Sequence, residues 1–439
     1  MTVFRIEAVH CLPLGWSHDD YLVHAQVYHG TRALKTLHVT DPSRIEAGGF
    51  YPRIIFNTWL TLEDLTVNCL PRESRLVLTL FGRSQRTVDS QHQPSQDSAA
   101  DPQDSTETHE QYELVELGWA AIQWFDYDGL LAGGQFALPL WPALCDRRSG
   151  PAPPPTHAPP APYPVLNLEI RPYTHNGVKW SETEESKHKT LSPEDLPKFD
   201  SLDGHTQSQL LHLIEQGAYQ CMPSECRDII WEKRRYLVQL AGALPLVLMA
   251  ATNWYGEQRE QLVALLNLWE KPSPLNAMHL LLPCFPEMAV RAAATRLIGA
   301  MSDDELCRVL PQLAQALRHE TYEASPMAEL LLSRALASPA VAHRLFWLLV
   351  HSLPNVPQAP NQEFLGISLE EGANESPECD AGMAATWRYR LLLRALLAVC
   401  GENLQKTLLR QQLLVKTLSE VAQAVKEAKE AGRQRALAA

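Results

Sequence analysis

Apolar and polar residues follow two different rhythms along this chain. Over roughly the first 170 residues, short stretches either alternate apolar with polar residues, as Val3–Val9 does, or are rich in β-branched and aromatic side chains, as Tyr21–Tyr28 and Ile54–Leu60 are. A period of two predicts β-strands separated by polar turns. The expected strands are Val3–Val9, Tyr21–Tyr28, Ile54–Leu60, Arg75–Phe81, Trp119–Trp124 and Val165–Ile170. Short strands in this arrangement are typical of an antiparallel β-sandwich.

From His205 onward the period becomes helical. One expected helix face shows the spacing of three and four residues well: it carries Leu306, Val309, Leu310, Leu313 and Leu317. Ser302 and Glu305 form the pattern of a capping box at the start of this helix. Ser325 and Ser338 each precede a proline, and we expect both serines to cap the helix that follows. Successive capped helices predict an α-solenoid of stacked helix pairs.

The expected fold is therefore multidomain, with the β-sandwich first and the α-solenoid second. We expect the sandwich to span residues 1–172, a linker to span 173–204 and the helical domain to span 205–400. A C-terminal helix is expected at 401–439.

Three polar segments interrupt these elements. Residues 84–113 contain seven acidic residues against one arginine and few large apolar residues, so we expect a disordered loop. Residues 150–164 are rich in proline and alanine, which predicts an extended loop. This loop is interpreted first as a stiff connector, and second as a ligand for a partner domain. Residues 354–380 form a further polar loop.

The C-terminal helix carries apolar residues on one side and more basic than acidic residues overall. Its apolar positions are Leu408, Leu414, Val415, Leu418, Val421 and Val425. Packing on a neighbouring helix is the simpler interpretation, and contact with an acidic membrane surface is the alternative.

Composition narrows the possible functions. The chain has 439 residues, of which 45% are hydrophobic and 20% charged, as in soluble globular proteins. The net charge of −13 does not suggest a nucleic-acid partner. The nine cysteines lack zinc-finger spacing, and reduced thiols in the cytoplasm are the simplest interpretation. We find no secretory signal, and no apolar run reaches the ~18 residues of a membrane span.

Several motifs of the helical half occur in a recognisable order. They are Ile230–Tyr236, Ala243–Leu248 with Trp254, Val290–Ala294, Ser302–Leu336, Ala342–Leu349, and Gln411 with Leu413–Val415. Together they resemble the helical accessory (PIK) domain of the phosphoinositide 3-kinases, and most of all the class II branch. Ala342–Leu349 in particular is similar to the class II pattern.

Motifs of the β half agree with this resemblance. They are Cys11–Pro13, Tyr28–Gly30, Trp59 with Leu70–Gly82, Leu117–Trp119, Phe125–Gly129 and Leu140–Pro142. They resemble the C2 domain of the same family, so the sandwich is expected to be of the C2 type. The resemblance extends from about residue 3 to residue 430, apart from the polar insertions.

The resemblance implies a parent lipid kinase. Such an enzyme uses ATP and Mg²⁺ to phosphorylate the 3-hydroxyl of phosphatidylinositol or its 4-phosphate in membrane signalling and trafficking. These 439 residues contain no glycine-rich phosphate loop, no Asp-Arg-His-x-x-Asn catalytic loop and no Asp-Phe-Gly metal motif. We therefore expect the C2 and helical portion of a class II enzyme without its catalytic domain, with no catalytic, cofactor-binding or metal-binding residues of its own.

Two interpretations fit this expectation. The first is a fragment or splice product of the kinase, and the second is a standalone membrane-associated adaptor or a truncated isoform that competes for partners. The resemblance implies a phospholipid membrane surface as partner, at the plasma membrane or endosome, with peripheral binding from the cytoplasm. Protein partners could bind through the loops.

A few residues invite a sharper interpretation. Asp19, Asp20, Asp126 and Asp128 could bind calcium, although solvated turn acids are the simpler interpretation. Trp16, Trp119, Trp124 and Trp141 could include a membrane-inserting side chain, although core packing is expected for most. His343 is expected to be a packed or capping histidine without a metal.

Overall fold

The computed structural model describes residues 2–63, 65–85, 112–143, 152–154, 156–159, 161–172, 177–180, 196–217, 222–353 and 386–427. Five expectations fall partly or wholly outside these residues: the centre of the acidic loop, parts of the proline-rich loop at 150–164, most of the linker at 173–204, the loop at 354–380 and the chain after residue 427. The described chain forms two compact units. Unit 1 contains Met1–Glu270 with Pro283–Glu287, and unit 2 contains Lys271–Leu282 and the helices from Met288 onward.

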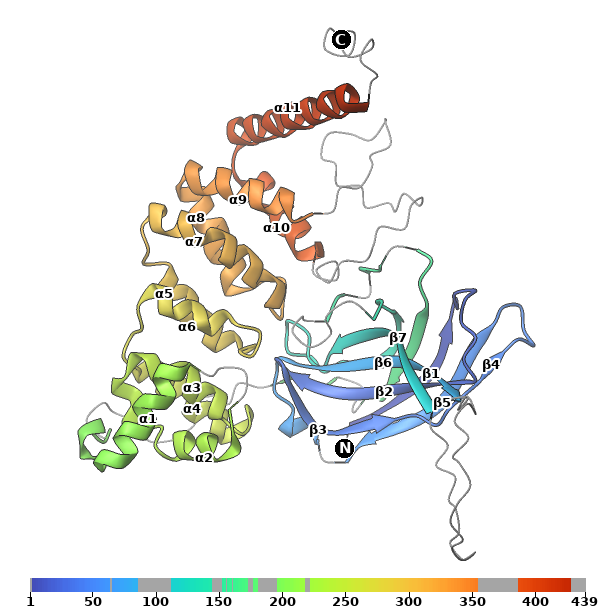
Figure 1. The fold of residues 1–439 in the computed structure, drawn as a ribbon, viewed down its shortest axis with the longest axis horizontal. Coiled ribbons are helices and arrows are strands. Elements are labelled where there is room, and N and C mark those ends of the chain that lie inside the picture. The colour runs from blue at the N-terminus through green and yellow to red at the C-terminus, as the bar shows by residue number, and fades with distance from the viewer. Residues whose placement is uncertain are drawn as a thin grey trace, which may run out of the picture. The chain divides into compact units, whose positions relative to one another are not determined.

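Unit 1 begins with an antiparallel β-sandwich, as predicted (Figure 1). One sheet has the strand order β4-β5-β1-β9-β8, and the other has the order β3-β2-β6-β7. The strands are β1 (Thr2–His10), β2 (Asp20–His29), β3 (Arg32–Val39), β4 (Ile45–Glu46), β5 (Arg53–Leu62), β6 (Ser74–Gln85), β7 (Tyr112–Gln123), β8 (Gly134–Pro139) and β9 (Val165–Ile170). All six expected strands are present.

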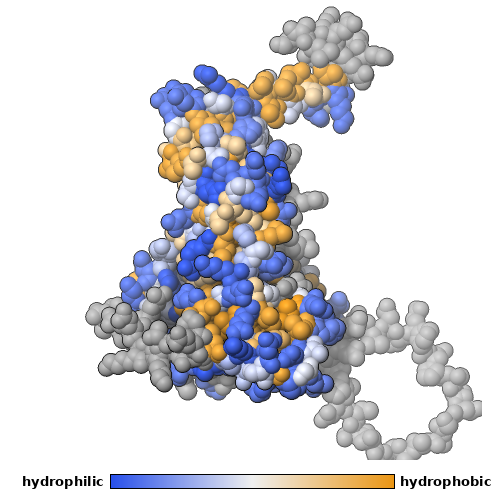
Figure 2. All heavy atoms as spheres, turned by 90° about the vertical axis from the view of Figure 1, so that its left-hand side faces the viewer, coloured by the Kyte–Doolittle hydropathy of each residue, from blue (hydrophilic) through white to orange (hydrophobic). Residues whose placement is uncertain are grey.

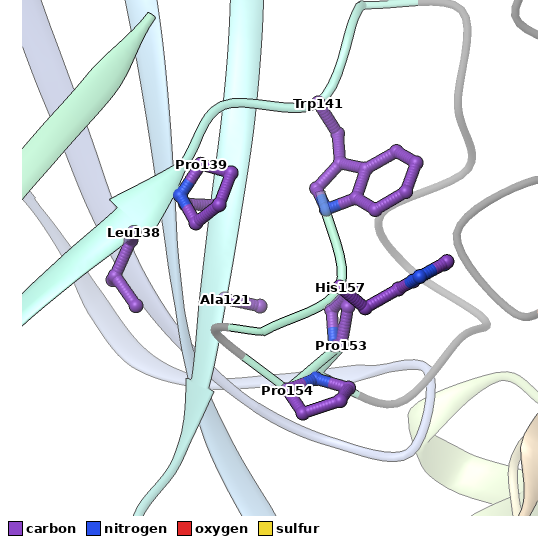
Figure 3. A pocket seen from close by; sticks show the side chains of 8 residues that line it. Ala121, Leu138, Pro139, Trp141, Pro153, Pro154 and His157 are labelled. Atoms are coloured by element: carbon purple, nitrogen blue, oxygen red, sulfur yellow. The ribbon is translucent and has the colours of Figure 1, made fainter. Parts of the chain in front are cut away.

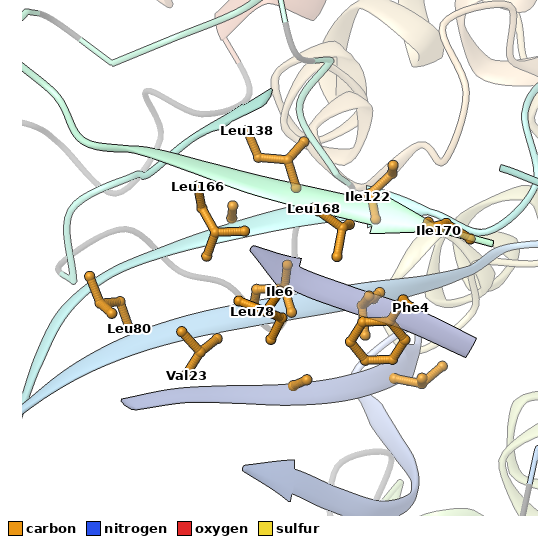
Figure 4. Close-up of a cluster of buried hydrophobic side chains, with 14 of the residues drawn as sticks. Phe4, Ile6, Val23, Leu78, Leu80, Ile122, Leu138, Leu166, Leu168 and Ile170 are labelled. Atoms are coloured by element: carbon orange, nitrogen blue, oxygen red, sulfur yellow. The ribbon is translucent and has the colours of Figure 1, made fainter. Parts of the chain in front are cut away.

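The sandwich core lies between the two sheets. Along β1 and β9, every second residue is buried, which is the burial pattern of strands with one face on a core. Phe4 and Ile6 of β1 meet Leu166 and Leu168 of β9 there, together with Leu78 of β6 (Figure 4). The period of two in the sequence therefore fixes which face of each strand points inward.

The β6–β7 hairpin, at one edge of the second sheet, is longer than the sequence predicts. β6 continues through Gln85 and β7 begins at Tyr112, where these two residues pair. The expected disordered loop of residues 84–113 therefore begins and ends in paired strand. Most residues from Tyr112 to Glu116 are exposed, so this part of the hairpin does not show the apolar alternation of a core strand.

The described part of the proline-rich segment lies against the outer face of the second sheet. Ala152 packs with Trp119 and Trp141 on the side of β7 that faces away from the sandwich core. Pro153 and Pro154, with His157, line a cavity of about 10 Å³ beside Trp141 (Figure 3). Such a space holds at most one water molecule, so the segment acts here as a cover for the sheet.

Unit 1 continues into four helices, α1 (Gly204–Gln216), α2 (Ser224–Glu232), α3 (Leu244–Ala250) and α4 (Gly256–Leu268). α3 comes from the most apolar run of the sequence, and nearly all of its side chains are buried. It packs on α2. Just beyond α4, the Trp269 indole Nε1 donates a hydrogen bond to the Leu240 carbonyl oxygen at 3.1 Å.

Unit 2 is a stack of helices. Its elements are α5 (Pro274–Ala277), α6 (Met288–Ile298), α7 (Asp303–Ala316), α8 (Pro326–Ala337), α9 (Pro339–His351), α10 (Thr386–Val399) and α11 (Glu402–Glu427). α9 packs against α7, α8 and α10, and α6 packs against α8. This arrangement confirms the predicted helical region of stacked neighbours.

Two of the three expected serine caps are present. Ser302 and Glu305 form the complete capping box of α7, and the Ser325 hydroxyl accepts the Ala328 amide at 3.2 Å in α8. Ser338 stands at the cap position of α9 but makes no capping bond with its side chain. Its hydroxyl bonds instead to the carboxylate of Asp303, a charged acceptor. The prediction for Ser338 was wrong because this competing partner is distant in the sequence.

α11 packs with its first half only. Leu408 is fully buried, whereas Leu414, Val415 and Leu418 are 45–60% exposed. Figure 2 shows apolar side chains on the surface of this helix, near the top of the view. The predicted packing of its apolar side is therefore confirmed at Leu408, and it stays a prediction for Leu414, Val415 and Leu418, which the described residues leave exposed. Within the described residues, no helix combines the length and the apolar character that a membrane crossing requires.

Candidate functional site

Three buried ionisable side chains meet within unit 1. They are His29 at the end of β2, Glu73 just before β6, and Glu287 at the end of the turn Pro283–Glu287. The His29 Nε2 and Glu287 Oε1 atoms are 2.8 Å apart. A nitrogen or oxygen atom of each of the three side chains lies within 4.8 Å of the others, and none of the three is more than 5% exposed. We refer to His29, Glu73 and Glu287 as the buried triad.

The strand register and one glycine create the buried triad. His29 pairs with Ser74 across β2 and β6, so Glu73 lies beside the end of β2. Gly30 follows with a φ of +58°, the left-handed conformation that favours glycine. A Cβ atom at Gly30 would lie 2.8 Å from the Pro283 carbonyl oxygen. The absence of a side chain at Gly30 therefore lets the β2–β3 hairpin press against the turn Pro283–Glu287.

Arginines surround the buried triad. The Arg259 Nε lies 3.5 Å from the Glu287 Oε2, and its guanidinium stands 4.6 Å from the ring centre of Trp180. Arg72 approaches the same ring at 5.7 Å. Arg75 donates to the Gly30 carbonyl oxygen at 3.4 Å, and Arg32 donates to the Ala251 carbonyl oxygen at 2.8 Å. The guanidinium groups thus tie the sandwich to the region of α3 and α4.

Burial shifts the protonation of the buried triad. Desolvation raises the pKa of Glu287 to about 7, although the Arg259 charge and a hydrogen bond with Glu73 act in the opposite direction. Desolvation lowers the pKa of His29 to about 4, against the attraction of Glu73. Because the charged form of each group loses hydration, His29 is neutral at pH 7 and Glu287 is close to half-protonated.

The buried triad has the side-chain types of a zinc site but not its electrostatics. One histidine and two carboxylates could ligate zinc. The guanidinium of Arg259 already forms an ion pair with Glu287, and the charges of Arg32 and Arg75 act on His29. A divalent cation would meet repulsion from all three arginines. We therefore describe the triad as the centre of an ion-pair network, and its burial leaves no open space for a substrate.

The four acids considered for calcium lie at two ends of the sandwich. Asp20 begins β2 and pairs with Arg83, whereas Asp126 follows β7 near the other end of β2. A ten-residue strand spans about 30 Å, which is too far for one calcium site. The Asp20 carboxylate binds Arg83 at 2.6 and 2.7 Å, and Asp126 accepts the Leu130 amide at 2.7 Å. Asp126 therefore acts locally in a turn, whereas Asp20 joins β2 to the neighbouring strand β6.

The remaining candidate residues, four tryptophans and His343, make structural contacts. Trp119, Trp124 and Trp141 are at most 2% exposed, and Trp16 stacks on Tyr21 with ring centres 6.0 Å apart. The core interpretation is confirmed for the three buried tryptophans. His343 is exposed on α9, and its Nε2 lies 2.9 Å from the Gln411 Oε1 of α11. It connects two helices, with no second metal ligand in contact among the residues that the structure describes.

One exposed feature is absent from the sequence predictions. Leu14, in the loop after β1, and Phe50, in the loop before β5, are fully exposed. Val9 pairs with Ile54, so these two loops extend from the same end of the first sheet. Tyr51 is 52% exposed and packs its ring against His10. We call Leu14 and Phe50 the apolar loop tips.

Two family models match the chain, one over the β-sandwich and one over the helical region that follows it. The phosphoinositide 3-kinase C2 model matches residues 17–152, and the model of the phosphoinositide 3-kinase family accessory domain (PIK domain) matches residues 198–377. The chain carries the C2 and PIK domains of the phosphoinositide 3-kinase family. The resemblance of the motifs in both halves is thereby confirmed.

Relatives of this chain are longer proteins. The human phosphatidylinositol 4-phosphate 3-kinase C2 domain-containing subunit beta is 29% identical over 98% of the chain, which covers 24% of that protein. The subunit alpha of Pongo abelii is 28% identical over 98% of the chain and 23% of its own length. The phosphatidylinositol 3-kinase piki-1 of Caenorhabditis elegans is 27% identical over 78% of the chain. The chain therefore spans about a quarter or less of these relatives.

The PIK domain has a second buried network, which lies in unit 2. Arg291 of α6 and Glu320 are 0% and 1% exposed, and their Nη1 and Oε1 atoms are 2.7 Å apart. Arg388 of α10 donates to the Thr321 and Tyr322 carbonyl oxygens at 3.1 and 3.0 Å. Burial lowers the pKa of Arg388 to about 10, which leaves it charged at neutral pH. Glu320 and the adjacent carbonyl groups thus hold α6 and α10 in place.

Motif residues of the C2 and PIK domains supply both networks. His29 belongs to the motif Tyr28–Gly30, Glu73 belongs to Leu70–Gly82, and Arg291 belongs to Val290–Ala294. The resemblance marked these segments without indicating their contacts. Glu287 gave one local signal that could have been used, because it is a single acid in the largely apolar stretch from Leu280 to Val290.

Proposed function

We propose that this chain is the C2 and helical scaffold portion of a class II phosphoinositide 3-kinase. The proposal rests on one observation, which is the buried contact within unit 1 between the C2 sandwich and the segments that follow it. There, His29 and Glu73 of the C2 sandwich meet Glu287, and Arg32 reaches the carbonyl of Ala251 after α3. A scaffold needs fixed contacts between its modules, and a fully buried ionic network provides them.

The catalytic activity of the parent is part of the same proposal. The relatives are named as phosphatidylinositol and phosphatidylinositol 4-phosphate 3-kinases. A parent of this kind would transfer the γ-phosphate of ATP to the 3-hydroxyl of such a lipid. The 439 residues contain none of the glycine-rich, catalytic-loop or metal-binding motifs that phosphoryl transfer requires. The proposed role of the chain itself is to hold and orient the other parts of the parent enzyme.

A lipid kinase assay tests this division of labour. The purified chain is incubated with ATP, Mg²⁺ and vesicles that contain phosphatidylinositol or its 4-phosphate. We expect no 3-phosphorylated lipid, because nothing in the chain is proposed to bind the ATP–magnesium complex. Formation of 3-phosphorylated product above that of a heat-denatured sample would refute the scaffold assignment.

We further propose that the C2 domain meets a phospholipid surface through its apolar loop tips. Leu14 and Phe50 expose their whole side chains to water at the same end of one sheet. Tyr51 and Trp16 lie on the same loops, and amphipathic aromatic rings favour the membrane interface. Single exposed apolar residues are common, whereas two fully exposed ones on adjacent loops favour a common apolar partner.

Vesicle sedimentation tests the membrane proposal. Burial of a leucine or phenylalanine side chain contributes about 1.5–3 kcal/mol, so the double variant Leu14→Ala, Phe50→Ala should bind at least about tenfold more weakly. The matched control is Leu275→Ala, because Leu275 is 61% exposed on α5, outside the C2 domain. Equal vesicle binding by the loop-tip variant and the control would show that these loops do not carry the interaction.

A further inference from the structure

Two sheet edges lie next to each other on one side of the β-sandwich. β7 ends the second sheet and β8 ends the first, and the two strands are in contact. Trp141, which follows β8, exchanges backbone hydrogen bonds with Trp119 of β7 at 2.7 and 2.8 Å. Ala121 of β7, together with Leu138 and Pro139 of β8, lines the same space as Trp141. We call Ala121, Leu138, Pro139 and Trp141 the β7–β8 groove.

A proline-rich segment of the same chain occupies the β7–β8 groove (Figure 3). We call residues 152–159, as far as the structure describes them, the proline strap. Pro153 and Pro154 lie against the groove, and the centre of the His157 ring is 5.2 Å from that of the Trp141 ring. The strap therefore covers apolar surface that the two sheet edges would otherwise expose to water.

The contact between the strap and the groove has the chemistry of proline-rich peptide recognition. A proline has no amide hydrogen, so neither Pro153 nor Pro154 can extend a sheet by a ladder bond. They contribute their rings to the contact instead. Grooves lined by aromatic side chains bind extended proline-rich segments in this way, because such segments are already ordered before they bind. The strap thus indicates the class of ligand that the groove accepts.

The strap fits the groove incompletely. A cavity of about 10 Å³ remains between them. Trp119 packs with Trp141 and Ala152 and is only 1% exposed. Among the described residues, its indole Nε1 has no hydrogen-bond acceptor, although buried indole N–H groups usually have one. A proline-rich segment with other side chains presents different volumes and carbonyl positions, so a ligand that fits better than the strap is possible.

We propose that the β7–β8 groove is a docking surface for a proline-rich segment of a partner protein, and that the proline strap is its intramolecular competitor. The strap covers the groove until the partner segment displaces it. Both ends of the surrounding loop stay attached to the sandwich, through the bridge between Trp119 and Trp141 and through the Leu140 amide, which donates to the Pro164 carbonyl oxygen at 2.8 Å. This interaction is independent of the scaffold role and of the membrane contact proposed above.

Fluorescence anisotropy tests whether the groove binds such a segment. The probe is a labelled peptide with the sequence of residues 150–164. The proteins are the full chain and a strap-replaced variant, in which glycine and serine take the place of residues 152–159 without a change of length. A tethered competitor has an effective concentration in about the millimolar range, so its removal should tighten peptide binding at least about tenfold. Equal or weaker binding by the strap-replaced variant would refute the proposal.

Two controls show whether the peptide binds in the groove and through its prolines. A peptide with alanine at every proline should bind the strap-replaced variant at least about tenfold more weakly, because it is not held in the extended form. In the same variant, Ala121→Leu places a larger side chain in the groove and should also weaken binding about tenfold. The matched substitution is Ala33→Leu, at an exposed position of β3 on the opposite edge of the second sheet. Equal binding of the two peptides, or equal effects of the two leucines, would overturn the proposal.

A milder variant separates competition from a general loss of structure. Pro153→Ser with Pro154→Ser weakens the strap and leaves the rest of the loop unchanged, so its affinity for the peptide should lie between those of the wild type and the strap-replaced variant. Circular dichroism should show a cooperative thermal transition for all three proteins. Loss of that transition in both variants would show that the strap is a permanent part of the sandwich and not a competitor, which would also refute the proposal.

Discussion

Removal of the Glu320 carboxylate is expected to destabilise unit 2 more than most single substitutions. In Glu320→Ala, Arg291 keeps its charge at 0% exposure but loses its carboxylate partner, while its bonds to the carbonyl oxygens of Leu281 and Leu282 remain. Arg388 also loses a favourable charge, since Glu320 is the first of the groups that favour its ionised form. An uncompensated buried charge of this kind costs about 3–5 kcal/mol.

Differential scanning calorimetry measures the effect as a shift of the melting temperature. For a folding unit of 150–250 residues, 1 kcal/mol corresponds to roughly 2–4 °C, so the transition of unit 2 should fall by about 6–20 °C. The matched control is Glu329→Ala on the exposed side of α8. It should change the free energy of unfolding by no more than about 0.5 kcal/mol.

A double variant tests whether the cost arises from the unpaired charge. Arg291→Met with Glu320→Leu removes both charges and keeps apolar volume in the same place. Replacement of a buried ion pair by apolar residues is often close to neutral, so the double variant should recover at least half of the lost stability. The reasoning would be refuted if Glu320→Ala melted within 2 °C of the wild type, or if the double variant were no more stable than Glu320→Ala.

Two further pairs of variants compare positions that look alike in the sequence. Ser302→Ala removes a capping box and should cost about 1 kcal/mol in urea unfolding, with Asp303 present or replaced. Ser338→Ala removes no cap but does remove the bond to the Asp303 carboxylate, so in an Asp303→Ala background, where that bond is already lost, it should cost about 0.5 kcal/mol or less. Equal losses of the two serine variants in that background would contradict the difference between the two caps. Leu408→Ala should cost about 2–5 kcal/mol because Leu408 is fully buried, whereas Leu414→Ala, at 59% exposure, should change stability by less than about 0.5 kcal/mol. A large loss in Leu414→Ala would show that the second half of α11 is covered in solution.

The sequence predicts the interior of this fold better than its edges. β1, β2 and β9 were recognisable because burial of one face imposes a period of two on most of their side chains, whereas β6 was recognisable as a short run of apolar and β-branched residues, nearly all of which are buried. β3, β4 and β8 were missed, and all three lie at the edges of their sheets. An edge strand has a neighbour on one side only and needs fewer apolar residues, so its pattern is weak.

The buried triad could not be predicted from the sequence for a different reason. His29 and Glu287 are 258 residues apart, and neither position is part of a local pattern that indicates the other. Burial of an acid depends on which partners the fold supplies, and the sequence does not state these partners. The same limit applies to the apolar side of α11. An amphipathic pattern shows that one side of a helix can be covered, but it does not show which element or partner covers it.

The turn Pro283–Glu287 belongs to unit 1, although the residues on both sides of it belong to unit 2. The boundary between the units is therefore crossed three times between Glu270 and Met288. A single cut of the polypeptide cannot release both units intact: a cut before Pro283 removes Glu287 from the sandwich, and a cut after Glu287 leaves Lys271–Leu282 on the wrong fragment. Recombination that exchanges one unit for a homologous one must therefore transfer at least two separate pieces of the gene, which constrains the two units to evolve together.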